Sequence, residues 1–148
     1  ASDVYKRQNM KKKRRIFEDH ELTDYYKDRK VLIEITKKSF SESHITYYIN
    51  IELLRNKYLN YTDYVAERSM CLIDHSIISC SEDLNGLMRV LLQHKCKRAK
   101  RWLLKVLSSY PFRGTGHIVG EYIDRETGFL DIEKAERDQE EIWRKESN

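Results

Sequence analysis

Eight lysine and arginine side chains lie within 37 residues, Leu84 to Gly120, that contain no aspartate or glutamate. Both side chains donate charged hydrogen bonds, and phosphate oxygens are among their best acceptors. The tail that follows, Glu121 to Asn148, reverses the balance with ten acids against five bases. Solubility alone would mix both signs along the chain. The segregation therefore predicts a basic region that attracts an anionic partner.

The basic residues of this stretch fall at helical spacing. Lys97, Lys100 and Arg101 are three and four residues apart, so one face of a helix would follow a phosphate backbone. We predict a non-enzymatic nucleic-acid-binding protein, with the choice between DNA and RNA left open. The predicted nucleic-acid-binding residues are Lys11, Lys12, Lys13, Arg14 and Arg15 in an N-terminal arm, Lys95, Lys97, Arg98, Lys100, Arg101 and Lys105 in the helix, and Arg113 in the loop after it. In the competing interpretation, the basic face is solvated or docks on the acidic C-terminal helix.

The acidic C-terminal segment carries an apolar stripe and supports an alternative function. Ile132, Ala135, Ile142 and Trp143 recur near helical spacing, and a large aromatic residue is a typical interface anchor. These four residues are the predicted partner-binding set for a protein–protein interaction module, which would bind another protein or a second copy of the chain. In the competing interpretation, Trp143 closes the intramolecular core.

A second alternative is a divergent metal-dependent nuclease. Such enzymes gather acidic side chains around Mg²⁺, and Glu34, Glu52, Glu121 and Asp131 lie on or at the ends of predicted strands. No spacing of a known catalytic motif supports this alternative, so we assign no catalytic residue.

Five residues have the side chains that zinc prefers, namely Cys71, His75, Cys80, His94 and Cys96. Their spacing matches no zinc finger, ribbon or knuckle, and we predict neither a metal nor another cofactor. Three cysteines suit buried thiols in a reducing compartment, which predicts a cytoplasmic protein. No apolar run reaches the roughly 18 residues of a membrane span, so we expect no membrane partner.

The elements that must position these residues come from periodicity. Residues 30–38 and 44–53 are rich in β-branched side chains with alternating polarity, which predicts a β-hairpin. Residues 54–70 have apolar residues near helical spacing. Residues 16–28 give a weakly helical or irregular pattern, and residues 71–79 fit a helix or a strand equally.

The second half predicts one long basic helix from about residue 82 to 109. Ser79 and Glu82 match a capping box, and the polar residues His94 to Arg98 mark the place where the helix would divide. Residues 117–122 and 128–132 then predict a second short hairpin, and an acidic amphipathic helix begins near Ile132. This order of elements predicts the α+β class.

The domain organisation is simple. Ala1 to Gln8 (ASDVYKRQ) resembles translated adaptor sequence, so we interpret residues 1–9 as a non-native leader before Met10. Residues 10–15 form a basic arm, and we expect residues 16–148 to form a single α+β domain. The small size and the leader favour a bacterial, phage or mobile-element origin.

Overall fold

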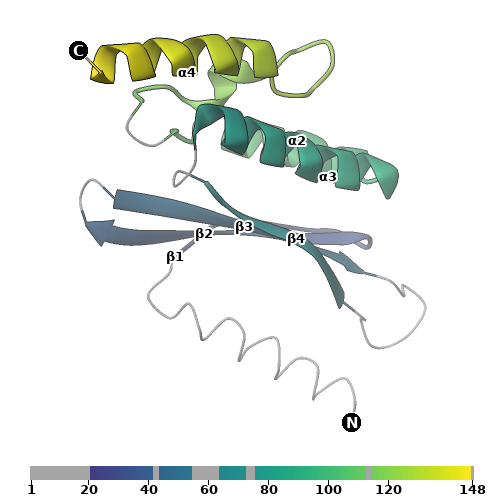
Figure 1. The fold of residues 1–148 in the computed structure, drawn as a ribbon. Coiled ribbons are helices and arrows are strands. Elements are labelled where there is room, and N and C mark those ends of the chain that lie inside the picture. Colours follow the sequence, from purple (N-terminus) through teal and green to yellow (C-terminus); the bar gives the residue numbers. More distant parts are fainter. Residues whose placement is uncertain (1–20, 42–43, 55–63, 73–75, 113–114, 148) are drawn as a thin grey trace.

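The computed structural model describes residues 21–41, 44–54, 64–72, 76–112 and 115–147. In these residues a four-stranded antiparallel sheet lies beneath a set of helices, which confirms the predicted α+β class (Figure 1). The predicted leader, residues 1–9, and the basic arm, residues 10–15, lie outside the described residues.

The sheet is a meander whose strands pair in chain order. The strands are β1 (Glu21–Lys27), β2 (Val31–Ser41), β3 (His44–Leu54) and β4 (Tyr64–Leu72). The predicted hairpin is confirmed as β2 and β3, which place Ile33 opposite Ile51 and Ile35 opposite Ile49. All four isoleucines are fully buried on the face that the helices cover, so the alternation of apolar residues fixes the register.

The sequence interpretation of the two outer strands was wrong. Residues 21–27, expected to be helical or irregular, form the edge strand β1, and residues 64–70, expected to be helical, belong to β4. A bulge between Leu22 and Asp24 interrupts the pairing of β1 with β2. β1 is mostly exposed, so its sequence has no strong apolar alternation to mark it as a strand.

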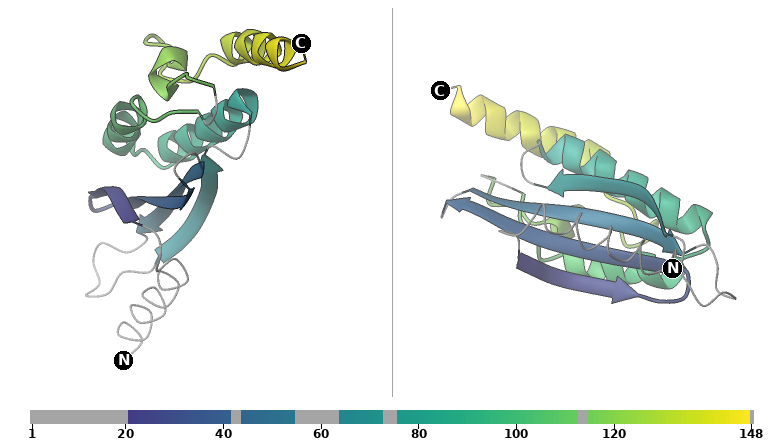
Figure 2. Two further views of the ribbon diagram at one scale, coloured as in Figure 1. Left: turned by 90° about the vertical axis from the view of Figure 1, so that its left-hand side faces the viewer. Right: turned by 90° about the horizontal axis from the view of Figure 1, so that it is seen from below.

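Helix α2 (Ile77–Gln93) crosses the buried face of the sheet (Figure 2). Ser76 is its N-cap and accepts a hydrogen bond from the Ser79 N–H at 3.2 Å. The predicted cap at Ser79 with Glu82 was therefore placed three residues too late. The first turn buries Ile77 and Cys80, so packing against the core begins the helix at Ile77, directly after the Ser76 cap.

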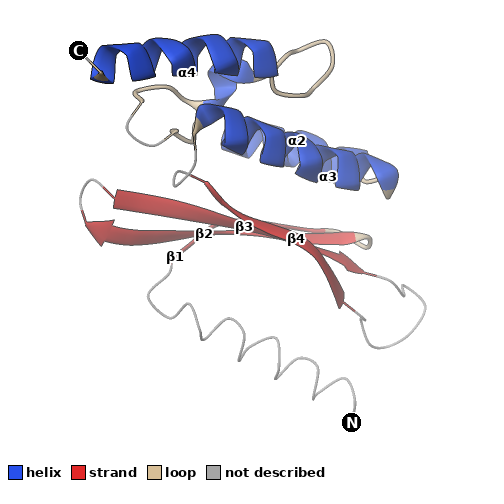
Figure 3. Cartoon of the chain, in the orientation of Figure 1, coloured by secondary structure: helices blue, strands red, loops and turns tan. Residues whose placement is uncertain are grey.

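The predicted long helix divides at the polar insertion, and α3 (Lys97–Leu107) follows as a separate helix (Figure 3). Lys95 has a positive φ of 59°, a left-handed conformation that ends α2. The N–H of Cys96 then donates to the Leu91 carbonyl at 2.8 Å. This junction turns the chain back, and α3 packs against α2 and β1.

The predicted second hairpin is absent from the described residues. Residues 119–122 form a 3₁₀ helix, η1 (Val119–Tyr122), and only an isolated bridge joins Ile123 to Leu130. Asn85 of α2 binds both backbone polar groups of Leu130, at 2.7 and 3.0 Å. Because a side chain already satisfies this backbone, the segment does not need a strand partner.

The predicted C-terminal helix is confirmed as α4 (Ile132–Glu146), with Asp131 as its N-cap. It packs against α2 and η1 and forms the layer farthest from the sheet (Figure 2). Gln139 of α4 accepts the backbone N–H of Ile77 at 2.8 Å, so α4 caps the first turn of α2. Among the helices in the described ranges, none combines the length and the apolar character needed to cross a membrane.

Candidate nucleic-acid interface

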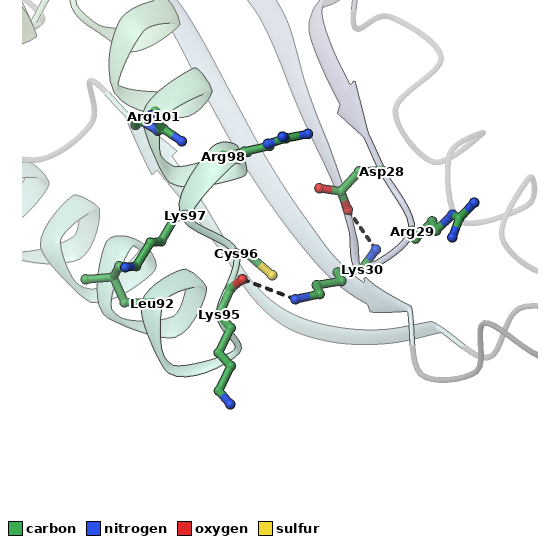
Figure 4. A pocket seen from close by; sticks show the side chains of 9 residues that line it. All are labelled: Asp28, Arg29, Lys30, Leu92, Lys95, Cys96, Lys97, Arg98 and Arg101. Carbon is green, nitrogen blue, oxygen red and sulfur yellow. Dashed lines mark hydrogen bonds between the residues drawn. The ribbon is translucent and has the colours of Figure 1, made fainter.

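Six cationic side chains surround one open hollow between the β1–β2 turn and the α2–α3 junction (Figure 4). The hollow has a volume of about 890 Å³. We call it the basic hollow, and its lining residues are Asp28, Arg29, Lys30, Leu92, Lys95, Cys96, Lys97, Arg98 and Arg101. It therefore joins part of the predicted basic helix to a turn that lies far away in the sequence.

Asp28 organises the first wall of the basic hollow and is the one acid among its described lining residues. Its Oδ1 accepts the backbone N–H groups of Lys30 and Val31 at 2.7 and 2.9 Å. Its Oδ2 accepts the Tyr26 hydroxyl at 2.7 Å. Three donors thus engage the carboxylate in holding the turn, which leaves Arg29 and Lys30 on the exposed side.

Tyr26 links this first wall to the second. Its ring contacts Trp102 of α3, with ring centroids 5.3 Å apart. Burial raises the pKa of Tyr26 to about 12, and the hydrogen bond to Asp28 acts in the same direction. The hydroxyl therefore stays protonated at neutral pH and continues to donate to Asp28.

The α2–α3 junction forms the second wall. The Lys30 ammonium donates to the Lys95 carbonyl at 3.4 Å, so this contact spans the gap between the walls (Figure 4). Cys96 lies between them and is 3% exposed. Burial raises the pKa of the Cys96 thiol, with Asp28 adding to the effect, so this residue stays neutral at physiological pH.

Helix α3 presents its basic side to solvent because its apolar side belongs to the core. Ala99, Leu103 and Leu107 are fully buried. We call the exposed side the α3 basic face, and it consists of Lys97, Arg98, Arg101 and Lys105. From Lys97 to Lys105 it extends about 12 Å along the helix. The N-terminus of α3 lies at the basic hollow, so the helix dipole adds to its positive potential.

These cations have no acidic partner in the part of the chain that the structure describes. None of the basic hollow residues, and no residue of the α3 basic face, forms a salt bridge there. The acidic α4 packs on α2 and η1, whereas α3 packs on α2 and β1. The structure thus gives no support to the interpretation in which the basic face docks on the acidic helix.

The remaining predicted nucleic-acid-binding residues have other positions. Lys100 turns away from the basic hollow, and its ammonium lies 4.6 Å from the centre of the Phe129 ring. Arg113 and the arm residues Lys11 to Arg15 lie outside the described residues. Sequence reasoning missed Arg29 and Lys30. The signal for these two residues was a charged turn between two strands. This turn was not recognised because β1 was not predicted as a strand.

The predicted partner-binding residues of α4 divide into two groups. Ala135 is fully buried, and Ile142 packs against the core, so both serve the fold of the chain itself. Ile132 is half-buried. Trp143 differs from these three because 50% of its surface is exposed.

The four acids of the nuclease alternative lie in different layers. Glu34 and Glu52 are on the sheet, Glu121 is on η1, and Asp131 caps α4. Glu121 accepts the Ile118 N–H at 2.9 Å, and this bond lowers its pKa. Within the described ranges, no group of three or more His, Cys, Asp or Glu side chains is arranged to hold a metal ion.

The zinc-type residues are likewise separated. Cys80 lies in the first turn of α2, whereas His94 and Cys96 follow its last turn. The helix between Cys80 and Gln93 is roughly 20 Å long, so Cys80 does not share a site with the other two. The side chains of Cys71 and His75 lie outside the described residues.

Comparison with known proteins adds no relative. No protein-family model matches the chain, and neither the curated proteins nor the solved structures contain a match. The functional inference therefore depends on the geometry of the basic hollow and the α3 basic face.

Proposed function

We propose that this protein binds nucleic acid through phosphate contacts from the basic hollow and the α3 basic face. The supporting observation is that six cations line one hollow and come from two segments that are 65 residues apart, as measured between Lys30 and Lys95. Like charges repel, so a fold that gathers them without acidic partners among the described residues favours an anionic ligand. A phosphate backbone supplies several regularly spaced charges, which suits cations distributed along a helix.

Salt dependence is the sharpest test because phosphate contacts release counterions. If six phosphate contacts form on duplex DNA, raising the salt from roughly 50 to 200 mM should reduce the affinity by about 10³-fold. Fluorescence anisotropy with single-stranded DNA, duplex DNA and RNA measures this slope and identifies the preferred form. A shallow slope on all three nucleic acids, or no binding at the lower salt concentration, contradicts the proposal.

Two double variants locate the interface. R98Q/R101Q removes two cations of the basic hollow and should reduce the magnitude of the slope by about 1.8. R137Q/R144Q is the matched control, since it removes the same charge from exposed positions on α4 and should leave the slope unchanged. Equal effects of the two variants would mean that net charge, and not the basic hollow, attracts the nucleic acid.

The exposed Trp143 supports a second candidate function. A half-exposed tryptophan at the end of an amphipathic helix suits an interface anchor, and we propose a second copy of the chain as its partner. Sedimentation at several protein concentrations tests this proposal. A W143A variant should dissociate any dimer, and a chain that is monomeric at every concentration overturns it.

We also propose that the protein acts in the cytoplasm, where bacterial or phage nucleic acid is accessible. The supporting observation is the buried Cys96, which forms no disulfide among the described residues, as suits a reducing compartment. Fractionation of cells that express the protein tests this placement, and recovery from the periplasm or medium contradicts it.

A further inference from the structure

The basic hollow continues into the α3 basic face. The Lys30 ammonium donates to the Lys95 carbonyl across the gap between the two walls (Figure 4). Lys97, Arg98 and Arg101 belong both to the hollow and to the α3 basic face, whereas Lys105 lies one turn farther along α3 and outside the hollow. A strand that follows the α3 basic face would therefore reach the hollow.

The charge of the hollow also exceeds what an internal phosphate needs. An internal phosphodiester carries one negative charge, whereas a phosphate monoester carries about −1.5 to −2 at neutral pH and has three strong acceptor oxygens. Three of the lining cations are arginines, Arg29, Arg98 and Arg101, whose planar groups can bind two phosphate oxygens at once. Asp28 is the one acid among the described lining residues, so it offsets one of the six positive charges and leaves an excess of five.

The size of the hollow suits more than a phosphate group. Its volume of about 890 Å³ lies within the roughly 300–1,000 Å³ of sites that hold small molecules. It therefore has room for the sugar of a terminal nucleotide together with its phosphate. The half-buried Leu92 and the neutral Cys96 add apolar surface between the charged walls.

We propose that the basic hollow binds the terminal phosphate monoester of a nucleic-acid strand, while the α3 basic face contacts the phosphates that follow. This inference rests on the proposed nucleic-acid binding and specifies the part of the nucleic acid that is recognised. It makes the protein selective for strand ends with a phosphate over ends with a hydroxyl.

The test compares oligonucleotides of one sequence with a 5′-phosphate, a 3′-phosphate or hydroxyls at both ends, each with an internal dye. One phosphorylated strand should bind about tenfold more tightly than the hydroxyl strand, since several charged hydrogen bonds are gained. The comparison of the two phosphorylated strands identifies the end. Equal affinity of all three strands overturns this inference and leaves nucleic-acid binding intact, whereas no binding by any strand overturns both proposals.

A free nucleotide is the other source of the same chemistry. A nucleoside 5′-monophosphate serves as the competitor against the preferred phosphorylated strand. The strand should bind more tightly, because the α3 basic face contributes only to the strand. A monophosphate that binds as tightly as the strand would assign the hollow to free nucleotides and overturn recognition of strand ends.

Two single variants separate the hollow from the rest of the basic face. R29Q changes a lining residue without touching the carboxylate that holds the turn, and should abolish most of the preference for the phosphorylated end. K105Q removes a cation outside the hollow and should reduce the affinity for all three oligonucleotides by the same factor. An unchanged preference in R29Q, with an unfolding midpoint like that of the wild type, overturns the assignment.

Discussion

The side chain of Asn85 forms two hydrogen bonds with the backbone of Leu130, which is 45 residues away in the sequence. Its amide nitrogen donates to the Leu130 carbonyl at 3.0 Å, and its oxygen accepts the Leu130 N–H at 2.7 Å. Both residues are buried, with 4% of their surface exposed. Asn85 thus joins α2 to the segment before α4 in place of a β-ladder.

We expect N85A to lower the free energy of unfolding by about 2–4 kcal/mol, because a buried N–H and a buried carbonyl lose their partners. Urea denaturation measures the change. Q93A, an exposed position near the end of the same helix, is the control and should change stability by less than about 0.5 kcal/mol. Similar losses in both variants would show that the bonds to Leu130 contribute little.

The elements that the sequence predicts well are those whose pattern is local. The β2–β3 hairpin follows from isoleucines that alternate in both strands, since each buried position lies opposite another. The acidic helix α4 likewise follows from apolar residues at helical spacing after the capping Asp131. Neither element requires knowledge of a distant segment.

The elements that the sequence does not reveal depend on distant partners. β1 is an exposed edge strand, and only its pairing with β2 defines it. The segment near Leu130 has the composition of a strand, but the side chain of Asn85 takes the place of a neighbouring strand. The basic hollow is likewise invisible in the sequence, because Arg29 and Lys30 meet Lys95 only when the sheet and the helices assemble.

The left-handed conformation of Lys95 leads to opposite predictions for two neighbouring lysines. A residue with a side chain at a φ of 59° costs roughly 1–2 kcal/mol, and glycine avoids this cost at an entropic penalty of about 0.5–1 kcal/mol. We therefore expect K95G to raise the free energy of unfolding by about 0.5–1 kcal/mol. K97G, in the helical first position of α3, should lower it by up to about 1 kcal/mol.

The same two variants, K95G and K97G, allow effects on stability to be measured separately from effects on nucleic-acid binding. Each variant removes one cation from the basic hollow, so each should reduce the salt slope of nucleic-acid binding by about 0.9. Thermal unfolding and anisotropy measure the two effects on the same samples. A loss of stability in K95G would show that the lysine side chain makes a contact that outweighs the strain at this position.

Two buried tyrosines, Tyr110 and Tyr122, and the half-buried Tyr26 make the fold sensitive to alkaline pH. Burial raises the pKa of Tyr26, Tyr110 and Tyr122, and hydrogen bonds to Asp28, Asp24 and Asp138 add to the effect. The unfolded chain has tyrosine pKa values near 10. Above about pH 10 the unfolded chain therefore loses protons that the folded chain keeps, and the free energy of unfolding falls as pH rises. Below about pH 10 these three tyrosines contribute no pH dependence to the free energy of unfolding.

Urea unfolding at several values between about pH 8 and pH 11 checks this expectation. Lysines titrate in the same range, so the informative quantity is the difference from a variant. Y122F removes one of the three groups and should show a shallower decline above pH 10, although it is less stable throughout because Asp138 loses a donor. Identical declines in Y122F and the wild type would show that Tyr122 ionises as readily in the folded chain as in the unfolded one.

We expect helix α4 to contribute to stability through Gln139 more than through its larger neighbour Trp143. Gln139 is 5% exposed and accepts the N–H of the buried Ile77, so Q139A leaves that N–H without a partner. We expect Q139A to cost about 1–3 kcal/mol of unfolding free energy. W143A removes a far larger side chain, but half of its surface is already in water, so the monomer should lose about 1 kcal/mol or less.

The two variants also separate the intramolecular role of α4 from an interface role. Urea denaturation at low protein concentration gives the stability of the monomer, and sedimentation at high concentration reports association. Q139A should lower the stability of the monomer, and W143A should reduce association if two copies meet at Trp143. A loss in W143A that equals or exceeds the loss in Q139A at low concentration would place Trp143 in the core of the monomer and remove the argument for an interface there.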